Sequence, residues 1–378
     1  MRDEAELRRA LRDVELPRAD RERALALVRT AFAERERVSW PHRHGRSLAV
    51  AATAAVVVAC AVTSPGRAVL GSLRDAVGRE GVKRASPALV ALPAPGRLLV
   101  QSAGGPWIVQ ADGSRRLLGS YRDAAWSPHG LFVAATRPDQ LVALDPEGRV
   151  RWALARPRVR FPRWAGSRTN TKIAYLTGSR LHVVAGDGMH DVDLCGGPTA
   201  AHVAPAWRPR KGWALAYATT RGRVYVWDAG ACSLLWRSPP FAKPRSLEWS
   251  SNGDRLALLT ADKLVVFSGS HPVVRYLRGA SAMAFAPGSH RLAVVQGGRL
   301  LVFDTDRLSV PPREIFAGAG RFGDVAWSPD GRWLLLSWPT ADQLLFIRST
   351  GVRRLLAYSH VTEQFGGQSF PNIKGWCC

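Results

Sequence analysis

Cysteine and methionine are scarce in this sequence, with five cysteines and three methionines among 378 residues. Five cysteines are too few to staple a chain of this length, which excludes a disulfide scaffold. Aromatic residues are not scarce, because 14 Trp and 12 Phe supply enough apolar surface for a core and exclude a disordered chain. The length allows two or three domains, or a single repeat fold.

Acidic residues are also few, since 30 Asp and Glu stand against 53 Lys and Arg and leave a net charge of +23. This balance favours anionic partners such as lipid headgroups, acidic glycans or nucleic acid. Only six of the basic residues are lysines, so a general preference for arginine explains part of the excess.

The motifs of common enzyme and metal sites are missing, because neither H-E-x-x-H, G-x-S-x-G nor a cysteine pair at zinc spacing occurs. Gly318–Gly323 satisfies G-x-G-x-x-G, but a strand is predicted after it instead of the helix that binds pyrophosphate. Asp187, Asp191 and Asp193 surround a predicted turn, and we interpret them as solvated carboxylates rather than calcium ligands. We therefore expect no catalytic residue, no metal and no cofactor.

Charged residues are absent from residues 47–66, whose centre from Leu48 to Val62 is apolar. Twenty residues at helical rise span about 30 Å, the thickness of a bilayer's hydrocarbon core, so we expect a transmembrane helix here. Four arginines precede this segment within fifteen residues and three follow it, which favours a cytoplasmic N-terminus. Residues 1–46 would then be a cytoplasmic helical tail, 67–94 a partly helical linker, and 95–378 an extracytoplasmic domain in a single-pass membrane protein.

The cysteines suggest one alternative anchor. Val57–Cys60 fits a bacterial lipobox, so a lipoprotein anchored at Cys60 is possible, although signal peptides begin nearer the start of a chain. In the repeat described next, Cys195 and Cys232 should point to opposite faces, and we expect no bond between them. Cys377 and Cys378 could form a vicinal disulfide or remain free.

An aromatic residue followed by a turn recurs through the second part of the chain, as in Trp-Ser-Pro-Asp-Gly at 327–331. Successive anchors lie 38, 43, 42, 36 and 42 residues apart, close to the roughly 40–45 residues of one four-stranded propeller blade. A seventh anchor belongs to the last predicted strand. The anchors are Trp126, Trp164, Trp207, Trp249, Phe285, Trp327 and Trp376.

The segments between anchors keep one order: a short apolar strand, a second such as Val224–Asp228, and a more polar edge strand such as Ser233–Arg237. The ends of the repeat complete each other. Arg97–Gln101, Trp107–Gln110 and Arg115–Leu118 are predicted as second, third and fourth strands without a first, and Phe370–Trp376 as a first strand alone. We therefore predict an all-β, seven-bladed β-propeller, closed by pairing of its N- and C-terminal strands so that no edge between first and last blades is left unpaired.

At these residues the chain resembles known repeat families. The Trp-Ser-Pro-Asp-Gly anchor followed by an apolar strand is similar to the WD40-like repeat of TolB-type propellers, over about residues 95–378. Leu141–Trp152 and Val224–Trp236 are similar to the repeats of quinoprotein-like propellers and outer-membrane assembly scaffolds. The resemblance implies a propeller that binds other molecules.

Basic residues gather in the segments that lead into each blade's first strand, around the mouth of the central channel. Arg122, Arg160 and Arg245 each lie four residues before an anchor and should occupy equivalent places on the ring. Such a ring would attract an anionic polymer or an acidic protein loop, whereas Arg-rich solvated loops are the alternative. The candidate residues are Arg122, Arg158, Arg160, Arg163, Lys243, Arg245, Arg278 and Arg321.

We expect a non-catalytic, membrane-anchored propeller that serves as a scaffold or sensor for an envelope protein or an anionic polymer. Nucleic acid is a poor partner for a domain outside the cytoplasm. Two alternatives stay open. One is a signalling receptor whose N-terminal helix is the output, and the other is a propeller enzyme of glycan hydrolase or lyase type, which needs carboxylates converging on one cleft.

Overall fold

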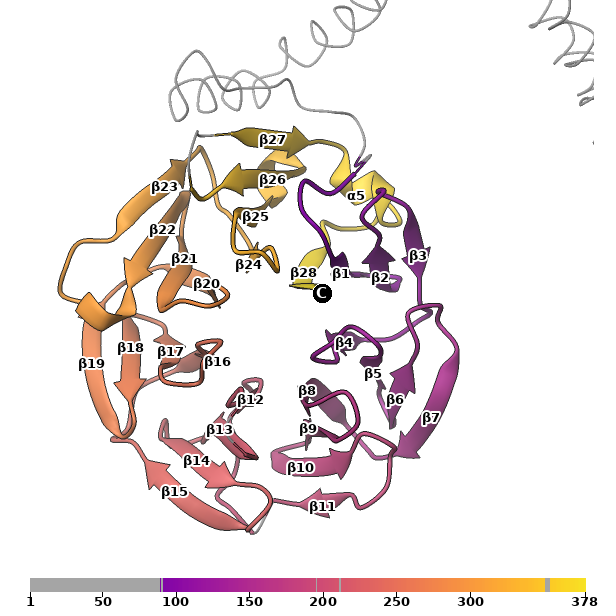
Figure 1. The fold of residues 1–378 in the computed structure, drawn as a ribbon, viewed down its shortest axis with the longest axis vertical. Helices are drawn as coiled ribbons and strands as arrows, with labels where there is room; N and C mark the ends of the chain where they lie inside the picture. Colours follow the sequence, from indigo (N-terminus) through magenta and orange to yellow (C-terminus); the bar gives the residue numbers. More distant parts are fainter. Residues whose placement is uncertain (1–88, 90, 195, 211, 351–353) are drawn as a thin grey trace, which may run out of the picture. The chain divides into compact units, whose positions relative to one another are not determined.

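The computed structural model describes residues 89, 91–194, 196–210, 212–350 and 354–378. These residues form seven four-stranded sheets arranged as blades around a centre (Figure 1). The predicted all-β, seven-bladed propeller is therefore confirmed. The predicted tail at 1–46, the predicted transmembrane helix at 47–66 and most of the linker lie outside the described residues. In the part of the chain that is described, no helix is long and apolar enough to cross a membrane.

Six blades are continuous in sequence, and their innermost strands are β4, β8, β12, β16, β20 and β24 (Figure 1). From the centre outward the strands are β4 (Asp123–Trp126), β5 (Val133–Arg137), β6 (Gln140–Leu144) and β7 (Val150–Ala155); β8 (Val159–Gly166), β9 (Thr171–Thr177), β10 (Arg180–Ala185) and β11 (Val192–Asp193); β12 (Ala206–Trp207), β13 (Ala214–Ala218), β14 (Val224–Asp228) and β15 (Ser233–Arg237); β16 (Pro244–Trp249), β17 (Leu256–Thr260), β18 (Lys263–Ser268) and β19 (His271–Tyr276); β20 (Ala280–Phe285), β21 (Arg291–Gln296), β22 (Arg299–Asp304) and β23 (Arg313–Ala317); β24 (Val325–Trp327), β25 (Trp333–Trp338), β26 (Gln343–Arg348) and β27 (Leu355–Tyr358).

The seventh blade combines both ends of the described chain. Its order is β28 (Asn372–Cys377), β1 (Arg97–Ser102), β2 (Gly105–Val109) and β3 (Arg115–Leu117). β28 pairs antiparallel with β1, and Leu98 lies opposite Trp376. The core also extends beyond the predicted boundary at residue 95, because Leu89 and Leu92 pack into the same cluster as Trp376. Three short helical segments complete the description: η1 (Thr305–Arg307), η2 (Pro339–Ala341) and α5 (Val361–Gln364).

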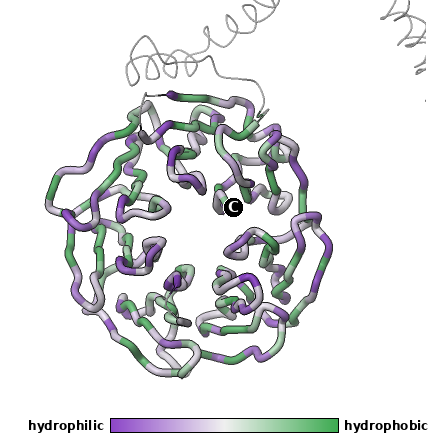
Figure 2. Tube along the Cα trace, in the orientation of Figure 1, coloured by the Kyte–Doolittle hydropathy of each residue, from purple (hydrophilic) through white to green (hydrophobic). Residues whose placement is uncertain are grey.

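The middle strands of each blade are apolar because adjacent blades cover both of their faces. β17 is buried along its whole length, whereas five of the six residues of the outermost strand β19 are exposed. Figure 2 shows this gradient, with hydrophobic segments concentrated in the blade interiors. The sequence pattern of two apolar strands followed by a polar edge strand therefore reflects their places in the blade. The apolar strands lie in its interior, and the polar strand lies at its outer edge.

Three anchor tryptophans, Trp207, Trp249 and Trp327, join neighbouring blades through their indole N–H groups. In three blades the indole donates to the main-chain oxygen of the residue just before the previous blade's anchor, which satisfies a buried donor and fixes the distance between two innermost strands. The bonds are Trp207 Nε1 to Arg163 O (2.9 Å), Trp249 Nε1 to Ala206 O (3.1 Å) and Trp327 Nε1 to Ala284 O (2.9 Å).

Two motif predictions can be compared with the structure. The G-x-G-x-x-G match at Gly318–Gly323 lies in the connection between β23 and β24 and is followed by a strand, as predicted. Cys377 and Cys378 form a disulfide. Cys232 is also disulfide-bonded. The expected absence of a Cys195–Cys232 bond stays a prediction, because Cys195 lies outside the described residues.

Candidate functional site

A cavity of about 700 Å³ occupies the centre of the ring, lined by residues of all seven innermost strands or the segments just before them. The residues three before each anchor, and one before six of the seven anchors, face it, because alternate residues of a strand share a face. At three before, the lining residues are Asp123, Phe161, Ala204, Ser246, Ala282, Asp324 and Ile373; at one before, they are Ala125, Arg163, Glu248, Ala284, Ala326 and Gly375. The small residues in both sets keep the cavity open.

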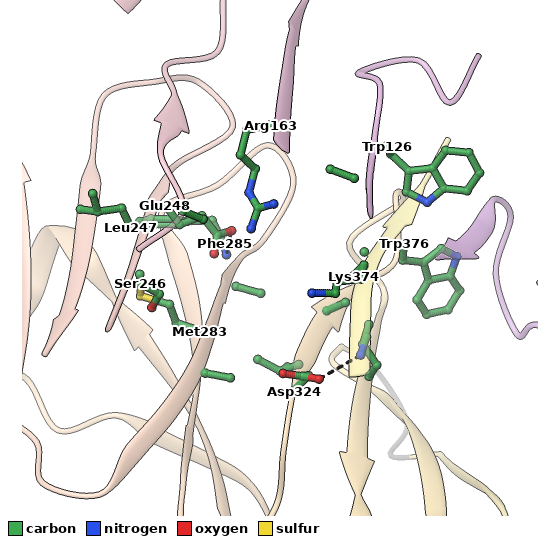
Figure 3. Close-up of a pocket in the computed structure, with 18 of the residues that line it drawn as sticks. Trp126, Arg163, Ser246, Leu247, Glu248, Met283, Phe285, Asp324, Lys374 and Trp376 are labelled. Carbon is green, nitrogen blue, oxygen red and sulfur yellow. Dashed lines mark hydrogen bonds between the residues drawn. The ribbon is translucent and has the colours of Figure 1, made fainter. Parts of the chain in front are cut away.

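Three charged residues meet beside the C-terminal strand. Lys374 Nζ lies 2.8 Å from Asp123 Oδ1, which joins β28 to β4. On the other side of β28, Asp324 Oδ2 accepts the main-chain N–H of Ile373 at 2.9 Å (Figure 3). Burial raises the pKa of Asp324, although that N–H and the charge of Lys374 act against the rise. This part of the wall therefore holds one ion pair and one carboxyl that is more easily protonated than usual.

A second pair, Arg163 on β8 and Glu248 on β16, lines the same cavity (Figure 3). Glu248 is half-buried, and its Oε1 accepts the main-chain N–H of Phe285 at 2.8 Å. Burial raises the pKa of Glu248 to about 7, against the opposing effects of that hydrogen bond and of the positive charge on Arg163. This carboxyl is therefore protonated far more easily than an ordinary glutamate.

The Glu248–Phe285 bond occurs at the one anchor that is not tryptophan. Phenylalanine has no indole N–H, so it cannot make the inter-blade bond that Trp249 makes to Ala206. Instead, the main-chain N–H of Phe285 donates to the side chain of Glu248, the residue just before the previous anchor. Where phenylalanine stands in place of the anchor tryptophan, the side chain of Glu248 therefore makes the hydrogen bond between the two blades.

The predicted basic residues divide between several places. Arg163 and Arg245 line the central cavity, and Arg160 contacts His202, another of its lining residues. Arg122 lines a separate hollow of about 580 Å³ that the β1–β2 turn and Phe370 also border. The remaining four candidates are exposed: Arg158, Lys243, Arg278 and Arg321. The proposed ring stays a prediction, with two members in one cavity and a third beside it.

Asp123, Ser246, Glu248, Asp324 and Lys374 were missed by the sequence reasoning. A usable signal did exist, because four of these residues lie three or one positions before an anchor. When the seven anchors are aligned, the positions three and one before them hold mostly small or apolar residues, and the charged side chains among them are easily recognised. These positions lie at or within the first strands, whereas the predicted basic residues come mostly from the segments that lead into those strands.

The interpretation of Asp191 as a solvated carboxylate is wrong. Its side chain is 5% exposed and accepts hydrogen bonds from Tyr175 Oη (2.7 Å) and Arg156 Nε (2.7 Å). His182 Nδ1 lies 3.5 Å away. Burial alone would raise the pKa of Asp191, but the neighbouring His182 and the hydrogen bonds from Tyr175 and Arg156 outweigh it and lower the pKa. Across the described ranges, no group of three or more His, Cys, Asp or Glu residues could hold a metal ion.

No family model and no curated protein matches the chain. Solved structures do match. One, described as KlHsv2 with loop 6CD replaced by a Gly-Ser linker, is 16% identical with a TM-score of 0.51, over 72% of this chain and 98% of the other. Another, from a crystal structure of the Mitotic Checkpoint Complex, is 14% identical with a TM-score of 0.51, over 63% and 78%. The chain shares their fold. Identity this low says nothing more about what it binds.

Proposed function

We propose that this protein is a membrane-anchored, extracytoplasmic propeller that binds an anionic envelope polymer or an acidic protein segment without catalysing a reaction. One observation supports the proposal above the others: Arg163 and Arg245 line a single central cavity, with Arg160 beside it. Cations from different blades around one opening provide the multipoint attraction that a polyanion requires. Pairing of β28 with β1 would close the ring and hold these blades at fixed positions.

The proposal is tested by changing Arg122, Arg160 and Arg245 together to Gln. Each exposed charge contributes roughly 0.5 kcal/mol, so the triple variant should bind a soluble polyuronate about 10-fold more weakly. Its unfolding temperature should not change, because exposed charges add little to stability. Residual binding should also depend less on salt, since fewer screened contacts remain.

A matched control removes the same charge from the turns that follow three anchors, at the other end of the innermost strands: Arg168, Arg210 and Arg332 to Gln. All three are exposed. This variant should keep its affinity for the polymer. Equal losses in both triple variants would show that binding follows net charge alone, and the ring would be rejected.

The second candidate is a glycan hydrolase or lyase, favoured by the convergence of Asp123, Glu248 and Asp324 on one cavity. Such enzymes use one protonated and one ionised carboxyl, and Glu248 and Asp123 would fill these roles. Against it, Asp123 is already paired with Lys374. Incubation with acidic and neutral polysaccharides, followed by assays for new reducing ends and unsaturated products, separates the two. Cleavage that disappears in Glu248→Gln would favour the enzyme.

A further inference from the structure

Arg163 and Glu248 line the central cavity one position before an anchor, where the other blades that reach it have small side chains. These are Ala125, Ala284, Ala326 and Gly375, while larger side chains such as Phe161 and Phe285 line it at other positions. Ser246 lies two residues before Glu248 on β16 and therefore on the same strand face. These three polar side chains define what we call the β16 pocket.

The polar groups of the β16 pocket have unused hydrogen-bonding capacity. Arg163 Nη1 donates to Pro162 O at 2.8 Å, and its guanidinium makes no ion pair with any described residue. The hydroxyl of Ser246 is buried and has no partner in the described part of the chain. Glu248 uses Oε1 for Phe285, which leaves Oε2 without a hydrogen bond to any described group. A guanidinium, a hydroxyl and a carboxyl oxygen are therefore available to one bound molecule.

We propose that the β16 pocket binds a small carboxylate, which sits between Arg163 and Glu248 and takes up one proton from solvent onto Glu248. The guanidinium of Arg163 pairs with the bound carboxylate, as this fork-shaped cation does with planar anions. Protonated Glu248 donates an O–H to the same carboxylate. Ser246 takes a further polar group of the ligand.

Proton uptake follows from placing two carboxyl groups side by side, because both cannot stay ionised at contact distance. The charge that acts on Glu248 is Arg163 from β8. Arg245 and His202 line the same cavity, Arg245 with its Nη1 donating to Ala280 O at 3.0 Å, while β17 and β20 present no charged side chain. Burial already raises the pKa of Glu248 to about 7, so the proton is taken up at little cost near neutral pH. A ligand carboxylate should raise that pKa further.

This inference is separate from the polymer proposal, although Arg163 belongs to both. The polymer proposal is tested at Arg122, Arg160 and Arg245, none of which belongs to the β16 pocket, and the pocket does not require them. A protein that binds the polyuronate but no small carboxylate would disprove only the pocket. The reverse result would disprove only the ring.

The test is calorimetric titration of the full-length protein with D-glucuronate and with N-acetylglutamate, using D-glucose as the uncharged control. Measurements at pH 6 and pH 8, each in two buffers of different ionisation enthalpy, count the protons bound. With a carboxyl of pKa about 7 in the free protein, affinity should fall about 10-fold from pH 6 to pH 8. Proton uptake should be near one at pH 8 and near zero at pH 6.

Two variants test whether Arg163 and Glu248 are the groups that bind the carboxylate. Arg163→Gln should bind the carboxylates at least about 10-fold more weakly, because it removes one charged contact to the ligand. Glu248→Gln keeps an acceptor for the N–H of Phe285 and supplies an amide donor, so it should still bind but without proton uptake at pH 8. Arg168→Gln, a change in an exposed turn that follows an anchor, should bind as the parent does.

Stronger binding of glucuronate would identify an acidic sugar as the natural class, and stronger binding of N-acetylglutamate an acidic peptide. The inference fails if glucose binds as well as either acid. It also fails if neither acid binds, if uptake is absent at pH 8, or if Arg163→Gln has no effect.

Discussion

Asp191 joins two blades through one buried carboxylate. Arg156 follows the outermost strand of one blade, and Asp191 immediately precedes the outermost strand of the next. Tyr175 adds a hydrogen bond from within the second blade. Removing one partner of such a cluster leaves the others without their acceptor, which costs more than the bonds themselves contribute.

Asp191→Asn should therefore destabilise the propeller by about 2–3 kcal/mol at pH 7. Its pKa is lowered in the folded state, so the stabilisation is present above the unfolded value near 3.8 and is lost as pH falls through the folded value. Urea unfolding followed by tryptophan fluorescence should show a large difference between parent and variant at pH 7, and a smaller one at pH 3.

The matched control is Asp187→Asn in the neighbouring turn, where the carboxylate is exposed and accepts the main-chain N–H of Met189. This change should cost no more than about 0.5 kcal/mol. If both variants unfold at the same urea concentration as the parent, Asp191 does not stabilise the contact between blades.

At the scale of the element, the short strand β28 contacts several other parts of the propeller. Trp376 on this strand is 8% exposed, packs edge-on against Phe346 and donates its indole N–H to Pro95 O at 3.1 Å. Lys374 and Ile373 bind the carboxylates of Asp123 and Asp324 on either side. One strand therefore contacts both neighbouring blades and the segment before β1.

Deleting residues 370–378 removes β28 and exposes the edge of β1, where Leu98 and Val100 are buried in the complete protein. An apolar, unpaired edge favours association between chains. The truncated propeller should elute as aggregate in size-exclusion chromatography. Trp376→Ala keeps the strand and should instead lower stability by about 3–5 kcal/mol, as expected for a large buried aromatic.

The control for this deletion is Cys377→Ser with Cys378→Ser, which removes the terminal disulfide and keeps the strand. That variant should remain monomeric. A truncated protein that stays monomeric and unfolds at the parent's temperature would rule out β28 as the strand that closes the ring.

The strands could be predicted because each repeat contains an anchor residue at the same place relative to its strands. The anchor fixes where the first strand ends, and the predicted second to fourth strands fall within about two residues of those observed, as at Ser233–Arg237. Contacts between repeats were not predictable. Arg156 and Asp191 are 35 residues apart in different blades, and neither position is marked by the repeat. Alignment of the anchors marks Glu248 as a charged residue one position before an anchor, but its hydrogen bond from the main-chain N–H of Phe285 has no signal in the sequence.

At the scale of the whole molecule, the net charge of +23 is not concentrated in the central cavity. The charged lining residues Arg163, Arg245 and Lys374 are matched by Asp123, Glu248 and Asp324. The excess of positive charge therefore belongs to surfaces outside the cavity and to residues beyond those described. Which compartment those surfaces face decides between an envelope polymer and nucleic acid as the main anionic partner.

The topology of the full chain can be measured directly. If residues 47–66 span a membrane with the N-terminus in the cytoplasm, protease added to intact cells or spheroplasts should digest the propeller and spare a tag placed before residue 1. The exposed turns of the outer strands, such as the one around Met189, are suitable cleavage sites because both backbone and side chains are accessible. Detergent lysis provides the control, since both parts should then be digested. A protected propeller with a digested tag would place the basic surface in the cytoplasm, where nucleic acid becomes a credible partner and the envelope proposal falls.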